Sequence, residues 1–201
     1  MIKALMVDVD GVLVNGRPED GKPWQTFLED DLGLPIDRLH RAFFGPYWED
    51  ILVGRARLMD HLIPVLQEIA PHLPPEQFIS YWFRKDSCLA VPLLQKLSSI
   101  RSAGIRIHLA TNQEHMRAAY LMEELGLSKH VDGIYYSAQL GVKKPDQAFF
   151  SKVRSYTGFE ACELLLIDDS LQNIQAAAKA GWKAVHWVDE SSLNAIQLAI
   201  H

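Results

Sequence analysis

The stretch IKALMVDVDGVL, residues 2–13, decides the fold predicted for this chain. It begins as a short apolar run of the kind that forms a buried strand, and it continues through Asp8, Asp10 and Gly11. Carboxylates two residues apart point to the same side of an extended chain, and glycine lets the backbone turn directly after them. One carboxylate can then attack a substrate while the other handles protons. Solvated turn aspartates or simple metal ligands are the alternative interpretation.

Further short apolar runs alternate with helical stretches, which is typical of a parallel α/β sheet. The additional strands that we expect are Ile105–Ala110, Val131–Tyr135, Leu164–Ile167 and Ala184–Trp187. Helical spacing of apolar residues between the runs predicts helices that end near Gly104, Gly126 and Gly181, and a last helix over Leu193–Ile200. The apolar face expected for the helix before Gly126 consists of Met116, Ala119, Tyr120, Met122 and Leu125.

The segment from Gly16 to Lys85 differs, because it contains helical patterns interrupted by prolines and no convincing strand. Its helical runs are Trp24–Leu32, Ile36–Phe44, Leu58–Ile69 and Glu76–Phe83. A block of helices after the first strand of a sheet is typical of an inserted subdomain. We therefore expect an α/β fold with a Rossmann-like parallel sheet core (residues 1–14 and 87–201) and an inserted all-helical cap (residues 15–86).

The composition is that of a folded protein. Of the 201 residues 48% are hydrophobic and 22% charged, which excludes disorder of the whole chain. The net charge of −5 gives no support to a nucleic-acid partner. We find no signal peptide and no apolar stretch near the roughly 18 residues of a membrane span. Because Cys88 and Cys162 are the only cysteines, we predict a reduced, cytoplasmic location. We expect no membrane association, and a monomer or homodimer by default.

Two polar motifs follow in the middle of the chain. Thr111 and Asn112 come directly after the second expected strand, where they either cap the next helix or hold a phosphoryl oxygen. Lys143 and Lys144 precede Pro145, which we expect to start a helix. A lysine there is either a solvated surface group or the cation that neutralises a phosphoryl oxygen or a carboxylate.

Asp168 and Asp169 end the apolar run LLLI at residues 164–167. Carboxylate oxygens suit Mg²⁺, so the pair predicts a site for a hard cation, with Asn173 one helical turn further on. The alternative is a helix N-terminus that favours acidic residues. Taken together, the motifs place a nucleophilic carboxylate, a hydroxyl, a lysine and an acidic pair at strand ends. These are the groups that phosphoryl transfer to an aspartate requires.

This combination resembles the haloacid dehalogenase-like hydrolase superfamily, in the branch with a helical cap inserted after the first motif. The residues that carry the resemblance are Asp8, Asp10, Thr111, Lys144, Asp168 and Asp169. It covers residues 1–14 and 87–187. The resemblance implies a Mg²⁺-dependent phosphatase that hydrolyses a small phosphorylated metabolite through an aspartyl phosphate.

The resemblance also implies roles for the matched residues. Asp8 would attack phosphorus, and Asp10 would protonate the leaving oxygen and then deprotonate the hydrolytic water. Thr111 and the backbone around Asn112 would bind the phosphoryl group, and Lys144 would steady the transferring charge.

In the same way, the resemblance implies a ligand set for Mg²⁺. The ion would lie between Asp8, the backbone carbonyl of Asp10 and Asp169, with Asp168 as a further or indirect acid. Family members that displace halide typically lack the second acid and work without metal, so Asp10 favours phosphate chemistry over dehalogenation. A phosphomutase of the same fold stays open. A phospho-accepting signalling module is disfavoured, because its acidic pair comes early in the chain.

The cap says least about the substrate, and sugar phosphates, phosphoglycolate-like acids and nucleotides all stay open. Its aromatic residues either line a pocket or, as we favour, form the cap's own core. These residues are Trp24, Phe43, Phe44, Tyr47, Trp48, Trp82 and Phe83. Arg55 and Arg57 either reach an anionic or polar substrate group or, by default, are solvated surface residues. His61 and His115 are either acid/base groups or plain helix residues, and neither belongs to a motif. We expect hinges at residues 15–21 and 84–87 that let the cap move.

Overall fold

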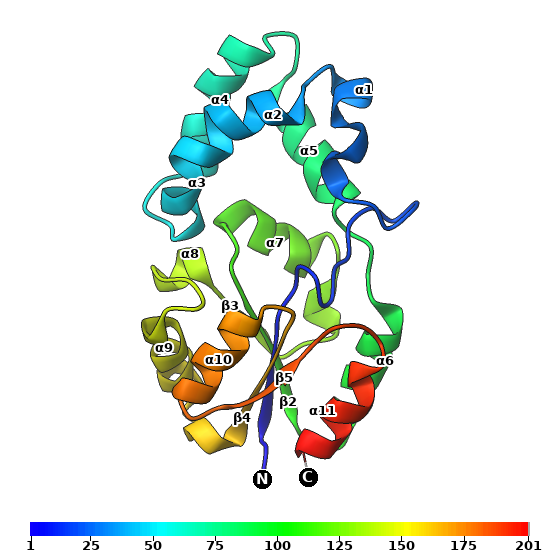
Figure 1. Ribbon diagram of the computed structural model, residues 1–201, viewed down its shortest axis with the longest axis vertical. Helices are drawn as coiled ribbons and strands as arrows, with labels where there is room; N and C mark the ends of the chain where they lie inside the picture. The colour runs from blue at the N-terminus through cyan, green and yellow to red at the C-terminus, as the bar shows by residue number, and fades with distance from the viewer. Residues whose placement is uncertain (201) are drawn as a thin grey trace.

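The computed structural model describes residues 1–200, so His201, the last residue assigned to the core, lies outside the described residues. Within that range the chain forms a five-stranded parallel sheet of order β3-β2-β1-β4-β5 (Figure 1). The strands are β1 (Ala4–Val7), β2 (Arg106–Thr111), β3 (Gly133–Tyr136), β4 (Leu164–Asp168) and β5 (Lys183–His186). The α/β class and the Rossmann-like parallel sheet predicted from the sequence are confirmed.

The strand order places a crevice at the carboxyl ends of β1 and β4. The chain runs from β1 outward to β2 and β3, then returns to the other side of β1 with β4. Such a reversal opens a crevice where parallel sheets bind ligands. Val7 pairs with Leu109 on one side and Ile167 on the other. Asp8 and Asp168 follow these paired positions, so they leave the sheet side by side.

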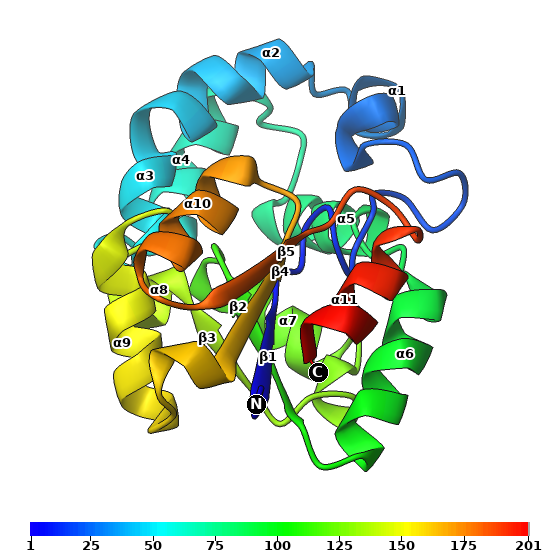
Figure 2. The same cartoon turned by 60° about the horizontal axis from the view of Figure 1, so that its bottom comes forward.

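Helices cover both faces of the sheet, which explains why β1 and β4 are continuous apolar runs. Leu5 and Val7 of β1 pack with α6, α7 and α11, whereas Ala4 and Met6 pack with α9 and α10 (Figures 1 and 2). The core helices are α6 (Val91–Ser102), α7 (His115–Glu123), η3 (Leu127–Lys129), α8 (Ser137–Leu140), α9 (Gln147–Thr157), η4 (Ala161–Glu163), α10 (Leu171–Lys179) and α11 (Ser192–Ile200).

The inserted segment is helical and packs around a cluster of its own, separate from the two clusters of the sheet. It lies above the carboxyl ends of the strands in Figure 1. Its elements are η1 (Trp24–Phe27), α1 (Leu28–Leu32), α2 (Ile36–Leu39), η2 (His40–Phe44), α3 (Gly45–Leu52), α4 (Leu58–Ile69) and α5 (Pro75–Lys85). The division at residues 14/15 and 86/87, and a movement of the cap, stay predictions that this separate cluster supports.

One cap helix extends further than the sequence indicates. The run expected over Ile36–Phe44 continues through α3 to Leu52, with a wide π-helical turn over His40–Phe44. Pro46 follows this turn. Proline has no N–H to donate to the preceding turn, and its ring needs room there, so a wide turn accommodates it.

The starts of two core helices also differ from expectation. Pro145 does not start a helix, because α9 begins two residues later with Asp146 as its N-cap. An aspartate accepts a bond from a first-turn N–H group, which proline at the same place would not do. The side chain of Glu114 caps α7, so neither Thr111 nor Asn112 has that task.

Among the helices of residues 1–200, none has the length and apolar character that a membrane span requires.

Candidate active site

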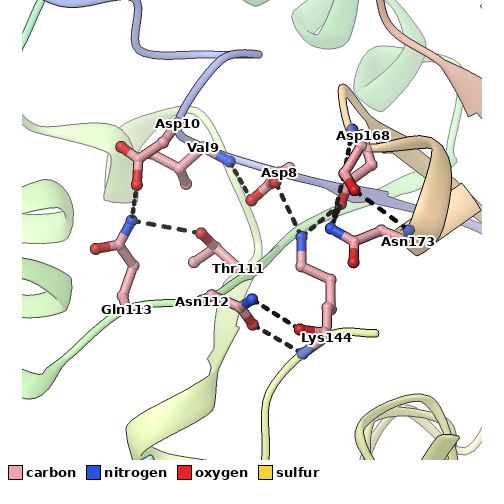
Figure 3. A network of polar contacts seen from close by, with 10 residues as sticks. Asp8, Val9, Asp10, Thr111, Asn112, Gln113, Lys144, Asp168 and Asn173 are labelled. Carbon is pink, nitrogen blue, oxygen red and sulfur yellow. Dashed lines mark hydrogen bonds and ion pairs between the residues drawn. The ribbon is translucent and has the colours of Figure 1, made fainter. Parts of the chain in front are cut away.

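A buried lysine joins two carboxylates at the ends of β1 and β4. Lys144 Nζ lies 3.0 Å from Asp8 Oδ2 and 2.6 Å from Asp168 Oδ2 (Figure 3). Exposed fractions are only 8% for Asp8, 2% for Lys144 and 0% for Asp168. A buried charge is tolerated when it is paired and hydrogen-bonded, and this lysine has both partners.

Asn112 fixes the loop that carries the lysine. Its side-chain Nδ2 donates to the carbonyl of Lys144 over 3.0 Å, and the Lys144 N–H donates to Asn112 Oδ1 over 2.8 Å. The peptide bond that follows, between Lys144 and Pro145, is cis. The side chain of Asn112 is therefore occupied with Lys144, and a contribution to phosphate binding would come from its backbone, as the sequence predicts.

Both carboxylate oxygens of Asp168 accept hydrogen bonds from neighbouring groups. Oδ1 accepts from the N–H of Ser170 and from Asn173 Nδ2, each over 2.9 Å. Oδ2 accepts from Lys144 and, at 3.1 Å, from Asn173. This arrangement suits a group that orients Lys144 better than one that holds a ligand directly.

Asp169 is exposed and lies against the glycine turn after β1. Gly11 has φ +79°, and a Cβ at that position would lie 2.4 Å from Asp169 Oδ2. Only glycine satisfies both the backbone conformation and the close approach. The turn expected at Gly11 is thus present, and it makes room for the second acid of the later pair.

Asp10 points away from Lys144 (Figure 3), and it lines a cleft together with residues of the cap. Its Oδ2 accepts from Gln113 Nε2 over 2.6 Å, and its Oδ1 lies 4.0 Å from the guanidinium of Arg117. The Asp10 side chain is 53% exposed, in contrast to the buried Asp8. Thr111 ends β2 with its Oγ1 3.5 Å from the same Gln113 Nε2. The two acids of the first motif therefore serve different sides of one site.

The electrostatics of the cluster show a shortage of positive charge. Burial raises the pKa of Asp8 to about 7, because the opposing effect of Lys144 is not sufficient and Asp168 and Asp10 add repulsion. Burial works to lower the pKa of Lys144, but Asp8 and Asp168 outweigh it and the pKa is raised. The lysine therefore stays charged, and the carboxyl groups of Asp8 and Asp169 have pKa values above their usual range, chiefly because of burial.

The acidic cluster fits a divalent cation. Carboxylate oxygens of Asp8, Asp168 and Asp169 all lie within 4.8 Å of one another. Three carboxylates face one lysine, and hard oxygen ligands are those that Mg²⁺ prefers. A divalent cation bound among these oxygens would offset the repulsion that helps to raise the pKa of Asp8. The oxygen donors and this excess of negative charge therefore both fit Mg²⁺.

Arg117 is a site residue that the sequence analysis missed. It is 2% exposed, and it donates to the carbonyl oxygens of Phe83, at 3.0 Å, and of Asp86. Its guanidinium also lies 3.5 Å from Asp86 Oδ2. Arg117 thus ties α7 to the end of the last cap helix, next to Asp10.

The error came from the choice of helix face. Met116 of the predicted apolar face is 39% exposed, whereas the residues that α7 buries are Arg117, Ala118 and Leu121. Arg117 and Leu121 are four residues apart and share one face. An arginine on the same helix face as Leu121 is visible in the sequence, but a search for apolar residues alone does not select that face.

A cleft of about 810 Å³ opens between Asp10 and the cap. Among the cap's aromatic residues, Phe43, Trp82 and Phe83 are buried in its core. The others are partly buried and pack against that core: Trp24, Phe44, Tyr47 and Trp48. Four of the set also line the cleft, so the two alternatives, a core and a pocket wall, both hold for them: Trp24, Phe44, Trp48 and Trp82.

Four polar residues weighed in the sequence analysis lie elsewhere. Arg55 is exposed and pairs with Asp50 at 2.6 Å, and Arg57 is exposed. His61 stacks on Tyr47 with ring centroids 4.4 Å apart. His115 is exposed, with Nδ1 3.2 Å from the hydroxyl of Tyr136. None of the four is among the described residues that line the cleft.

Comparison with known proteins gives one family and several relatives. The model of the haloacid dehalogenase-like hydrolase family matches residues 2–181. A phosphoglycolate phosphatase from Pseudomonas savastanoi pv. phaseolicola is 30% identical over 184 residues, which are 89% of this chain and 66% of that protein. The chain thus spans slightly less than two thirds of that relative. A sesquiterpene phosphatase from Aspergillus oryzae is 26% identical over 189 residues, 93% of this chain and 90% of that protein.

Solved structures share the fold. A haloacid dehalogenase family enzyme from Bacteroides thetaiotaomicron, in complex with magnesium and inorganic phosphate, matches with a TM-score of 0.78 and 18% identity. That match covers 96% of this chain and 99% of that one. A haloacid dehalogenase from Xanthobacter autotrophicus matches with a TM-score of 0.64 and 18% identity, over 99% and 83% of the two chains. Likeness at these identities concerns the fold.

Proposed function

This chain belongs to the haloacid dehalogenase-like hydrolase family, and on that premise we propose that it is a Mg²⁺-dependent phosphatase of small phosphorylated metabolites. The observation that carries the proposal is the contact of Lys144 with both Asp8 and Asp168, beside Asp169 and across from Asp10. The relatives named as phosphatases support it.

Asp8 is the proposed nucleophile. Its Oδ1 accepts from the N–H of Val9 over 2.8 Å and its Oδ2 faces Lys144, so the carboxylate is held in one orientation. Attack of a carboxylate oxygen on phosphorus forms an aspartyl phosphate while the bond to the alcohol oxygen breaks. Holding the attacking atom in place removes part of the entropic cost of that step.

Asp10 is the proposed acid and base. It lies at the open side of the site, where the alcohol oxygen leaves and the hydrolytic water enters. Partial removal of the carboxyl from water raises the pKa of Asp10, and the charge of Arg117 and the hydrogen bond from Gln113 partly offset this rise. A raised pKa suits a carboxyl that must first donate a proton near neutral pH and then take one from water.

The remaining groups hold the phosphoryl group and its charge. The hydroxyl of Thr111, which is 1% exposed, and the backbone of Asn112 would bind phosphoryl oxygens at the end of β2. Asp8, Asp169 and the backbone carbonyl of Asp10 would hold Mg²⁺, with Asp168 acting through Lys144. When bound, the ion supplies positive charge to the phosphoryl oxygens.

The proposal is tested by turnover of p-nitrophenyl phosphate with Mg²⁺ and with a chelator. We expect activity that needs Mg²⁺, and a loss of about a thousandfold or more in kcat for Asp8→Asn, because the nucleophile is gone. Asp60→Asn, at an exposed aspartate of α4, is the matched control and should keep full activity. Substantial turnover by Asp8→Asn, or none by the wild type with any divalent metal, would refute the proposal.

A further inference from the structure

We propose that the substrate is the phosphate monoester of an alcohol that carries no acidic group and whose ring or hydrocarbon part lies against an aromatic wall in the cleft. The aromatic wall consists of the rings of Trp24, Phe44, Trp48 and Trp82. This inference rests on the proposed function and names the class of molecule on which it acts.

The four rings contact one another around Trp82, which is itself only 7% exposed. The Trp82 centroid lies 5.3 Å from Trp24, in a stacked arrangement, and 5.5 Å from Phe44, nearly perpendicular. Trp48 lies 5.3 Å from Phe44 and 5.6 Å from Trp82. Such contacts between rings favour fixed positions, so the wall is available without a rearrangement of the cap.

The wall faces the position of the leaving group. Asp10 and Asp86 line the same cleft as the four rings. With phosphorus at Asp8, the ester oxygen that leaves must point toward Asp10, so the alcohol extends into this cleft. The cleft volume of about 810 Å³ has room for a group much larger than glycolate.

The charges near Asp10 disfavour an acidic alcohol. Arg117 lies 4.0 Å from Asp10 and 3.5 Å from Asp86, and its side chain is only 3% exposed. Arg117 also donates to the backbone carbonyls of Phe83 and Asp86, so it is already occupied. This balance leaves no unpaired cation here for the carboxylate of an acidic alcohol.

The basic residues at the rim do not change this balance. His40 and Arg41 line the cleft but are exposed, and Arg41 Nε donates to the carbonyl of Asp37 over 3.3 Å. An exposed cation in water contributes little to binding of an anion. Apolar burial against the wall is therefore the main source of binding energy for the alcohol.

The experiment compares three phosphate monoesters of primary alcohols: ethyl phosphate, 2-phenylethyl phosphate and 2-phosphoglycolate. We expect kcat/KM for 2-phenylethyl phosphate to exceed that for ethyl phosphate by about tenfold or more, because the phenyl ring is buried on the wall. The value for 2-phosphoglycolate should not exceed that for ethyl phosphate. The protein is used as the full chain with Mg²⁺.

Variants assign the preference to the wall. Trp48→Ala should lower the ratio of phenylethyl to ethyl turnover by about fivefold or more. Tyr47→Ala removes the neighbouring ring of α3, which stacks on His61 outside the cleft, and should leave the ratio unchanged. Trp24→Leu tests the wall from another segment if Trp48→Ala does not fold.

The outcomes separate the inference from the proposed function. Turnover of p-nitrophenyl phosphate together with a ratio near one overturns the inference and leaves the phosphatase proposal standing. A higher kcat/KM for 2-phosphoglycolate than for 2-phenylethyl phosphate does the same, and so does an unchanged ratio in folded Trp48→Ala. Absence of turnover for all phosphate esters overturns both.

Discussion

The two sides of Asp10 are built by different kinds of contact. Toward the sheet, Lys144, Asp8 and Asp168 are held by directional hydrogen bonds with defined partners. Toward the cap, the aromatic wall is held by ring contacts that depend on shape and area. Few combinations of side chains can satisfy hydrogen bonds between buried charges, whereas many combinations of apolar side chains can form an apolar surface. We therefore expect the chemistry to fail abruptly on substitution, and the substrate preference to change gradually.

The largest effect that would test this contrast is expected from Lys144→Met. Without the ammonium group, Asp8 and Asp168 face each other in a buried site with an unpaired charge. Breaking a buried pair costs about 3–5 kcal/mol of the free energy of unfolding. We also expect kcat to fall by about a thousandfold or more, because Asp8 loses the group that orients it. Urea unfolding and turnover of p-nitrophenyl phosphate measure the two effects.

The adjacent lysine provides the control. Lys143 pairs with Glu49 at 2.6 Å, and the two side chains are 33% and 68% exposed. An exposed pair contributes at most about 1 kcal/mol, so Lys143→Met should change the free energy of unfolding little and kcat hardly at all. Equal losses in the two variants would show that position in the loop matters rather than the buried contacts.

The same contrast explains what could be predicted from the sequence. Asp8, Thr111 and Asp168 were recognisable because each follows or ends an apolar strand run, and parallel strands bring their ends to one edge. The structure places these groups within one site. Local pattern was sufficient there, since the strand itself positions the side chain.

The rest depends on contacts between distant segments. Arg117 is buried because the cap's Phe83 and Asp86 supply acceptors for it, and nothing near it in the sequence shows this. Similarly, Trp48 lines the cleft while the neighbouring Tyr47 stacks on His61. The sequence shows that both residues are aromatic and lie in a helical segment, but it does not show which neighbouring residues each side chain contacts.

A smaller effect is expected from Gly11→Ala, which sharpens the contrast within the polar side. The new Cβ would meet Asp169 Oδ2 at 2.4 Å, so the carboxylate must move. Displacing a ligand or its support typically costs about 10–100-fold in metal affinity. The Mg²⁺ concentration for half-maximal activity should rise by that factor.

The control for that variant separates strain from displacement. Gly158 has a similar φ of +70° with nothing within 4 Å of the added Cβ, at the end of α9. Gly158→Ala should lose about 1–2 kcal/mol of unfolding free energy from the left-handed backbone and keep its Mg²⁺ dependence. A similar shift of Mg²⁺ dependence in both variants would assign the effect to general destabilisation.

The smallest effect concerns Asp86, which lies where the polar side meets the cap. Burial raises the pKa of Asp86 from 3.8 to about 6, Asp10 adds to the rise, and Arg117 opposes it. The folded state therefore holds the Asp86 proton more tightly than the unfolded chain. Its stabilising contribution is complete below the unfolded pKa and is lost as pH rises through about 6.

Asp86→Asn should remove this pH dependence and keep the backbone carbonyl that Arg117 uses. Relative to the wild type, the variant should gain on the order of 1–2 kcal/mol between pH 4 and pH 8, after discounting for solvent screening. Urea unfolding at both pH values measures the gain. Asp132 gives the opposite sign. Burial raises its pKa, but Arg101, the N–H of Ile107 and Arg106 together outweigh burial and lower it, so Asp132→Asn should lose more stability at pH 8 than at pH 4. If Asp86→Asn changed with pH in the same direction as Asp132→Asn, ionised Asp86 would be a stabilising partner of Arg117. The contact between the cap and the site would then depend on a directional ion pair, like the contacts around Lys144.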